Sequence, residues 1–288
     1  MDAIRLSYSR CKFDLVSLRA CGSCGLWPVN LQWSQAAGFA ASASGDVLQF
    51  GHVVLVMEEN HSYSEVIGSS SMPHLNSLAS QYGQIVTNDD AFTGPVGVDN
   101  IVRDLLAAGK TWKSYAESIP SAGYTGGDSY PYAKRHNILS YFTDITTSST
   151  QVKNLAPFSQ FSSDLANNQL PDFSFIVPDL LHDAHDPPLS VALDVADSWL
   201  QQNIAPLISS PVFQKDGLLI IVFDESDTSD LANGGHVAVV VISPQAKQGF
   251  KSTTLYQHQS TLRLILHSLQ VPAYRAAAST APEMGEFF

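Results

Sequence analysis

Two uninterrupted apolar runs constrain the fold of this chain more than any other feature of its sequence. They are Leu218–Phe223 and Val237–Ile242, both rich in β-branched residues and bounded by turn-forming residues. Apolar runs of strand length without polar alternation are typical of strands that are buried on both faces. Asp224 and Glu225 follow the first run directly. Because ligands of open α/β sheets bind beyond the carboxyl ends of the strands, this pair is either functional or the start of a polar loop.

The same pattern, an apolar strand followed by polar residues, occurs at two earlier places. His52–Met57 leads into Glu-Glu-Asn-His at 58–61, and Asp172–Val177 leads into a segment that contains His-Asp-Ala-His-Asp at 182–186. Periodicity and capping residues predict helices over 73–82, 98–108, 158–167, 190–207 and 257–269, with a further strand over 111–116. Strands that alternate with helices predict an α/β fold of the three-layer α/β/α sandwich type.

The first 48 residues differ from the rest of the chain. They contain all three cysteines, at 11, 21 and 24, and a small, flexible stretch over 34–46. Basic residues open the segment, but aspartates interrupt them and no clean apolar region follows, so the segment is not a convincing signal peptide. No stretch of the chain approaches the roughly 18 apolar residues of a membrane span. We expect a leader-like or disordered N-terminal arm over 1–48 and one folded domain over 49–288.

The charge of the chain limits its partners. The formal net charge is −12, only 15% of the residues are charged, and Lys and Arg form no cluster. Nucleic-acid binding depends on neutralising phosphates with basic residues, so it is not expected here. The Cys-x-x-Cys at 21–24 lacks a βαβ context and is weak evidence for a redox or zinc site. A polar stretch over 120–135, too long for an ordinary connection, ends next to His136 and is a candidate functional loop.

Clusters of Asp, Glu, Asn and His therefore follow three predicted strands, at 58–61, 182–186 and 224–227, and His236 precedes a fourth. Carboxylate and amide oxygens are hard ligands that suit divalent cations. Imidazoles add metal ligation or hydrogen bonds to an anionic substrate. Each cluster alone also has a structural explanation: a solvated strand end, a capped turn or a core histidine. Their coincidence favours a metal site at one edge of the sheet.

Taken in order, these motifs resemble the bacterial phosphoesterase family, which contains acid phosphatases and phospholipases C and has the alkaline-phosphatase-like fold. The resemblance covers about residues 50–270. The matching motifs are Val-Met-Glu-Glu-Asn-His-Ser-Tyr, Met-Pro-His-Leu-Asn-Ser-Leu-Ala-Ser-Gln-Tyr-Gly, Pro-Asp-Leu-Leu-His-Asp-Ala-His-Asp, Val-Phe-Asp-Glu-Ser and Gly-Gly-His-Val. The resemblance implies a hydrolase that cleaves phosphate mono- or diesters with a divalent metal ion. It leaves the identity of the metal and the oligomeric state open.

The resemblance also implies the metal ligands. Glu59 and Asn60 match the Glu-Asn pair that binds metal after the first strand of the family, and Asp224 and Glu225 match the second acidic pair. In such a site the metal activates the nucleophile and clamps the phosphoryl oxygens. We expect these four side chains to converge at the carboxyl edge of the sheet.

Three histidines are the expected catalytic residues. His185 matches a histidine near the phosphate, His136 matches one on the long loop, and His236 is a looser match. Their expected roles are to stabilise the developing charge and to protonate the leaving oxygen. Relatives of this kind are commonly exported, so the resemblance implies a secreted or periplasmic protein.

The chain departs from the family at the nucleophile. Family members carry a Ser or Thr nucleophile in a segment that follows the helix ending near Tyr-Gly. Here Tyr82-Gly83 passes directly into Gln-Ile-Val-Thr-Asn-Asp, which leaves Thr87 and Thr93 as the nearby hydroxyls. The nucleophile segment is therefore expected to be missing and the activity to be weak. The alternative is a non-catalytic relative that binds a metal and anions without turnover.

Overall fold

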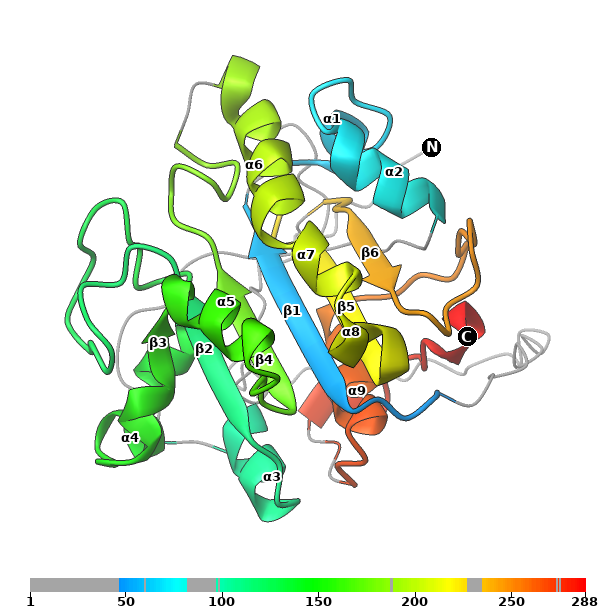
Figure 1. Ribbon diagram of the computed structural model, residues 1–288. Helices are drawn as coiled ribbons and strands as arrows, with labels where there is room; N and C mark the ends of the chain where they lie inside the picture. The colour runs from blue at the N-terminus through cyan, green and yellow to red at the C-terminus, as the bar shows by residue number, and fades with distance from the viewer. Residues whose placement is uncertain are drawn as a thin grey trace, which may run out of the picture.

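The computed structural model describes residues 47–288 except 60, 82–96, 98, 187–188, 227–234, 273 and 275. Its centre is a six-stranded sheet with the order β3-β2-β4-β1-β5-β6 (Figure 1). The strands are β1 (His52–Glu58), β2 (Trp112–Ala116), β3 (Leu155–Pro157), β4 (Phe173–Val177), β5 (Gly217–Phe223) and β6 (Val239–Ile242). All neighbouring pairs are parallel except β5 and β6, which are antiparallel.

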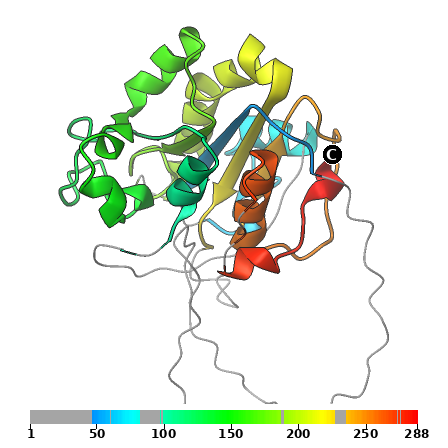
Figure 2. The same ribbon diagram turned by 90° about the horizontal axis from the view of Figure 1, so that it is seen from below.

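Helices cover both faces of this sheet (Figure 2). The α-helices are α1 (Tyr63–Val66), α2 (Pro73–Gln81), α3 (Ile101–Ala107), α4 (Thr143–Thr146), α5 (Phe158–Ala166), α6 (Leu189–Asn203), α7 (Ala205–Ile208), α8 (Pro211–Asp216) and α9 (His258–Ser268). Short 3-10 helices are η1 (Ile138–Tyr141), η2 (Gln151–Asn154), η4 (Ala276–Ser279) and η5 (Gly285–Phe287). Of the helices described, none is long and apolar enough to pass through a bilayer.

Alternating residues of β1 separate the two layers of the core. Val53 and Leu55 pack in the cluster that includes α3 and α9. Val54 and Val56 pack in the cluster that includes α2, α5 and α6 on the other face. All seven residues of β5 are buried, which explains why its sequence shows no polar alternation. The predicted α/β/α sandwich is confirmed.

Two expected elements differ in detail from those observed. The helix expected over 190–207 is two helices, α6 and α7, because Pro206 lies in the first turn of α7 and lacks the N–H that a continuous helix needs. The helix expected from residue 98 begins at Ile101, where the side chain of Asn100 accepts a hydrogen bond from the backbone N–H of Arg103 at 3.2 Å. The expected N-terminal arm lies almost wholly outside the described residues and stays a prediction.

The register of the strands brings three carboxyl ends to one edge of the sheet. Glu58 of β1 is paired with Phe223 of β5, and Val56 of β1 is paired with Ile176 of β4. The antiparallel β6 starts at the same edge, since Val239 is paired with Val222. The described residues that directly follow these strands, or directly precede β6, therefore lie at the upper end of β1 in Figure 1.

Candidate active site

Backbone hydrogen bonds join three segments at this edge. The N–H of Asp224, directly after β5, donates to the carbonyl of Glu58 at 3.0 Å. The N–H of Glu59, directly after β1, donates to the carbonyl of Asp183 at 2.7 Å. Asp183 belongs to the turn over 178–186 that follows β4. The segments that sequence reasoning proposed to converge are therefore in direct contact.

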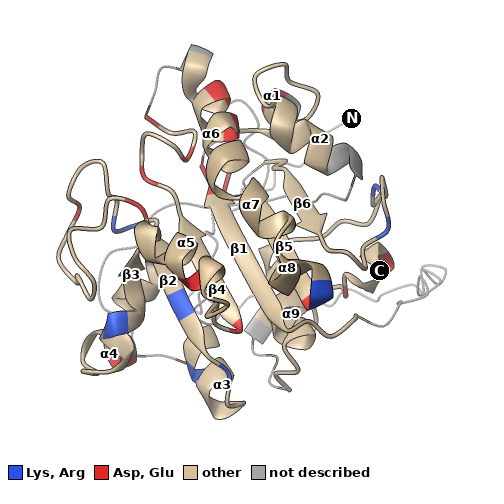
Figure 3. Ribbon diagram, viewed as in Figure 1, with Lys and Arg blue, Asp and Glu red and all other residues tan. Residues whose placement is uncertain are grey.

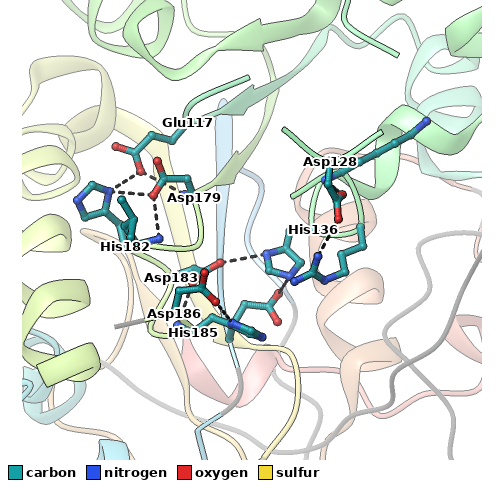
Figure 4. Close-up of polar contacts among 12 residues, drawn as sticks. Glu117, Asp128, His136, Asp179, His182, Asp183, His185 and Asp186 are labelled. Atoms are coloured by element: carbon teal, nitrogen blue, oxygen red, sulfur yellow. Dashed lines mark hydrogen bonds and ion pairs between the residues drawn. The ribbon is translucent and has the colours of Figure 1, made fainter. Parts of the chain in front are cut away.

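His136 connects the long loop to this edge. Its Nδ1 lies 3.0 Å from Oδ2 of Asp183, and its Nε2 lies 3.6 Å from Oε1 of Glu59 (Figure 4). The side chains of His136, Asp183 and Glu59 are only 7%, 1% and 8% exposed. Burial raises the pKa of Asp183 to about 7, because the charged carboxylate loses its hydration. Asp183 therefore takes up a proton far more readily than an ordinary carboxylate.

His185 lies beside His136 and is held by the same turn. Its backbone N–H donates to Oδ1 of Asp183 at 2.9 Å, and its Nδ1 lies 2.7 Å from Oδ1 of Asp186. The centres of the His136 and His185 rings are 6.0 Å apart. A carboxylate at Nδ1 fixes the tautomer of a histidine and leaves Nε2 for another partner. His185 is thus prepared to contact a ligand through Nε2.

Glu58 and Glu59 are both buried, so the interpretation of either as a solvated strand end is wrong. Neither carboxyl oxygen of Glu58 has a hydrogen-bond partner among the described residues. Burial, followed by repulsion from Asp183 and other carboxylates, raises the pKa of Glu58 well above its ordinary value. Figure 3 shows acidic segments at this end of β1 and along the chain that leads to α6. The repulsion shows that acidic side chains are crowded at this edge, an arrangement that a bound cation would relieve.

The remaining expected ligands lie at the same edge where they are described. The N–H of Glu225 donates to Oδ1 of Asp224 at 2.6 Å, and Nε2 of His258 donates to the Asp224 carbonyl at 2.8 Å. Burial lowers the pKa of His258 to about 4, so its ring is neutral and suited to this bond. Asn60 is outside the described residues. His236 is exposed and lies just before β6, which excludes its interpretation as a core histidine.

A second cluster of possible ligands lies nearby, on the other side of the turn after β4. Among the described residues, one group of three acidic and histidine side chains places its ligand atoms within 4.8 Å of one another: Glu117, Asp179 and His182. Glu117 Oε2 accepts from His182 Nδ1 at 2.9 Å and from the N–H of Asp179 at 3.2 Å. Glu117 Oε1 accepts from Nε1 of Trp199 at 3.1 Å.

The carboxylate of Asp179 also accepts several hydrogen bonds. Its Oδ2 accepts from Oγ of Ser118 at 2.6 Å, and its Oδ1 accepts from the N–H of Leu181 at 3.0 Å and lies 3.2 Å from Nδ1 of His182. All four oxygens of the Glu117–Asp179 pair thus have donors, and the charge that a metal would bring is supplied by the His182 ring. This cluster is a closed ion network rather than an open metal site.

Sequence reasoning missed several residues that build this edge. Glu117 follows β2 without any motif, and its role depends on β2 lying beside β4. His258 starts α9, far along the chain from the Asp224 that it contacts. His61 donates from Nε2 to the carbonyl of Ala184 at 3.1 Å, and only its place within the strand-end motif could have indicated this.

Comparison with known proteins identifies the family. Residues 66–272 match the model of the Phosphoesterase family. The chain belongs to this family. The family expected from the motifs is thereby confirmed.

The proteins similar to this chain include fungal and bacterial phosphatases. A probable acid phosphatase of Kluyveromyces lactis is 28% identical over 252 residues, which cover 77% of this chain and 59% of the relative. The phosphate-repressible acid phosphatase of Penicillium chrysogenum is 30% identical over 199 residues, covering 65% and 46%. The phosphatidylinositol-3-phosphatase of Mycobacterium tuberculosis is 28% identical over 255 residues, covering 79% and 80%. The chain spans about half the length of the fungal relatives.

Solved structures confirm the fold. A protein of the alkaline phosphatase superfamily from Vibrio parahaemolyticus has a TM-score of 0.53 and 12% identity, and the match covers 80% of this chain and 70% of that protein. A lipoteichoic acid synthase from Listeria monocytogenes also has a TM-score of 0.53 and 12% identity, with 81% and 76% covered. The phosphoesterase thus has the alkaline-phosphatase-like fold that the motifs implied.

Proposed function

We propose that this phosphoesterase hydrolyses phosphate esters, mono- or diesters, at the edge of the sheet where β1, β4 and β5 end. The observation that carries the proposal is His136, which lies buried between Glu59 and Asp183. An imidazole and two carboxylates from three separate segments fit acid–base and charge-stabilising chemistry on a phosphoryl group. Membership of the Phosphoesterase family and relatives named acid phosphatase support the same reaction class.

The metal site of this proposal consists of Glu59, Asn60, Asp224 and Glu225. The described members fit a hard divalent cation, since they are carboxylates that directly follow the adjacent strands β1 and β5. When bound, the cation would polarise the phosphoryl oxygens and facilitate attack.

The chain's own residues supply the remaining chemistry. With Nδ1 held by Asp186, His185 would use Nε2 to donate to a phosphoryl oxygen or to the leaving oxygen. His136, held by Asp183 and close to Glu59, would orient that carboxylate and balance its charge. His236, exposed at the same edge, would approach the substrate from the β6 side.

The nucleophile is the part of the site for which the sequence offers no family-like segment. The segment after Gly83, with Thr87 and Thr93, lies outside the described residues, so its shortening stays a prediction. Loss of a covalent nucleophile lowers the rate by several orders of magnitude, although binding and charge stabilisation leave residual activity. We infer weak turnover. The sequence after Gly83 also supports the second candidate, a relative that binds metal and anions without turnover.

The remaining proposals concern the whole protein. The chain is proposed to comprise an arm over 1–48 and a phosphoesterase domain over 49–288, to be secreted or periplasmic, and to bind no nucleic acid. Fractionation of expressing cells tests the location: unprocessed protein confined to the cytosol contradicts it.

A metal-restoration assay tests the function. The chain, stripped with a chelator, is assayed on an aryl phosphate with and without Mg²⁺, Mn²⁺ or Zn²⁺. We expect turnover well below the median enzyme rate of about 10 per second, restored by one of these cations and abolished in Asp224→Asn. The matched control is Asp216→Asn, because Asp216 precedes the strand that Asp224 follows.

Three outcomes of this assay are decisive. Metal-dependent stabilisation without turnover supports the non-catalytic relative. No response of activity or melting temperature to any cation contradicts the metal site. Turnover near the median enzyme rate shows that another nucleophile acts, and Thr87→Ala and Thr93→Ala then identify it.

A further inference from the structure

The turn over 178–186 serves two clusters at once. From one side of it, Asp183 and His185 reach the candidate active site, while Asp179 and His182 face Glu117 on the other side (Figure 4). The two sets follow one another within seven residues of chain, from Asp179 to His185. A contact that fixes His182 therefore also restrains Asp183 and His185, because only a short stretch of backbone separates them.

The backbone of this turn is tight and locally strained. The N–H groups of His182 and Asp183 both donate to the carbonyl of Asp179, at 2.8 and 2.9 Å. Ala184 has a φ of 74°, in the left-handed region that a residue with a Cβ adopts only with strain. Such a residue persists only where its surroundings hold it firmly. His61 holds Ala184 from one side through the carbonyl of that residue.

We propose that His182 is the positioning residue that holds the turn from the other side. Its ring, clamped between Glu117 and Asp179, fixes the place of Asp183 and therefore of His185 in the active site. This inference rests on the proposed function, since it assigns His182 a role in that reaction without contact with the substrate.

Three contacts of His182 support this role. Nδ1 donates to Glu117 at 2.9 Å and to Asp179 at 3.2 Å, and the ring stacks on Trp199 of α6 with 6.4 Å between ring centres. The partners come from the end of β2, from the turn itself and from α6, so the turn is tied to two neighbouring elements. Hydrogen bonds to Asp179 and Glu117 raise the pKa of His182 to about 10, so the ring carries its charge at neutral pH.

Two hydrogen bonds of Asp183 connect the clamped turn to the candidate active site. The carbonyl of Asp183 accepts the N–H of Glu59, and its Oδ1 accepts the N–H of His185. If the clamp is removed, the strain at Ala184 is free to relax and both contacts lengthen. Displacing reacting groups by about 1 Å lowers a rate on the order of a hundredfold. Substrate binding is affected less, because the proposed metal ligands Glu59 and Asp224 directly follow strands of the sheet.

The test compares His182→Gln with Glu117→Gln, the milder variant that keeps the shape of the acid, and with His267→Gln as control. His267 matches His182 closely: its side chain is 37% exposed against 34%, it contacts a carboxylate, Glu283, and it has an aromatic neighbour, Tyr274. It lies at the end of α9 away from the site. Two measurements are made on each purified, metal-loaded chain: kcat and KM for an aryl phosphate, and hydrogen exchange of the Glu59 amide.

We expect kcat to fall about tenfold to a hundredfold in His182→Gln, and less in Glu117→Gln, with KM changed less than about threefold. Exchange of the Glu59 amide is expected to accelerate in both variants and to stay at the wild-type rate in His267→Gln. A fall in kcat with unchanged Glu59 exchange overturns the proposal, because His182 then acts on the substrate itself. Unchanged kcat and exchange overturn it as well.

The exchange measurement separates this inference from the proposed function. If the wild-type chain shows no turnover, the proposed function fails, yet faster Glu59 exchange in His182→Gln still supports the clamp. If His182→Gln does not fold, Glu117→Gln decides by the same two measurements.

Discussion

Asp179 and Asp183 lie four residues apart in one turn and are equally well buried, with 4% and 1% of their surfaces exposed, yet their acidities move in opposite directions. Burial raises the pKa of Asp183 to about 7. Burial also raises the pKa of Asp179, but hydrogen bonds from His182, Ser118 and the Leu181 N–H outweigh it and lower the pKa below its ordinary value. Hydrogen bonds from His182 and Ser118 thus keep Asp179 charged, whereas at Asp183 the loss of hydration outweighs the hydrogen bond from the His185 N–H and leaves the carboxylate able to take a proton.

Two histidines of the same edge repeat this contrast. His182 faces two carboxylates, and its pKa is raised to about 10. His258 is buried against the carbonyl of Asp224, and burial lowers its pKa to about 4. His182 is therefore a fixed cation, whereas His258, buried on a carbonyl, is a fixed neutral donor. Neither is suited to exchange protons near pH 7.

The largest expected effect separates the two aspartates. Asp183→Asn is expected to lower kcat/KM about a hundredfold, because it weakens the support of His136 and removes the group that titrates near neutrality. Asp179→Asn keeps the size of the side chain and two of its acceptor contacts, so we expect a loss of about tenfold. The measurement is kcat/KM for an aryl phosphate with the activating metal.

A circular dichroism spectrum and a melting temperature of each variant show that the loss is not one of folding. If Asp179→Asn lowers kcat/KM as much as Asp183→Asn, the division between a supporting and a reacting aspartate is wrong. The two aspartates would then contribute equally to one site.

The main features of this edge could be predicted from sequence because they follow from chain-local patterns. Continuous apolar runs identified β1 and β5, and the acids after them, Glu59 and Asp224, were placed together by the rule that parallel strands end at one edge. The clamp could not be predicted in this way. Glu117 contacts His182 only because β2 and β4 are neighbours, and strand order cannot be derived from a local sequence pattern. The strain at Ala184 likewise depends on contacts from distant segments.

A middle-sized effect is expected at Glu58, the buried acid without a hydrogen-bond partner among the described residues. Glu58→Met replaces this carboxyl with an apolar group of similar size on a face that contains Val54 and Val56. An unpaired buried polar group destabilises a fold by about 1–3 kcal/mol, so we expect the free energy of unfolding to rise by about 1–2 kcal/mol. Urea unfolding of the metal-free chain measures it.

The control for this prediction is Glu58→Gln, which keeps a polar group of the same shape and is expected to change the free energy of unfolding by less than about 0.5 kcal/mol. If Glu58→Met is less stable than the wild type, Glu58 has a partner that stabilises the fold. Glu58 would then resemble Asp179, whose carboxylate accepts hydrogen bonds, and would no longer contrast with it.

The smallest expected effect is the pH dependence that His182 gives to stability. Its pKa is about 10 in the folded chain and near 6.5 when unfolded, so its contribution is fully present below pH 6.5 and is lost as the pH rises toward 10. About a third of the side chain is exposed, and solvent screening reduces the effect to about 2–4 °C of melting temperature. Differential scanning fluorimetry between pH 6.5 and 10 should therefore show a steeper decline for the wild type than for His182→Gln. Glu117→Gln, which leaves Asp179 as the one acidic partner, should give an intermediate slope.

Added salt should bring the three slopes closer together, because part of the interaction is open to solvent. Parallel slopes for all three chains at low salt would show that the His182 ring is uncharged in the folded state, and the distinction between a clamping and a reacting histidine would have to rest on geometry alone.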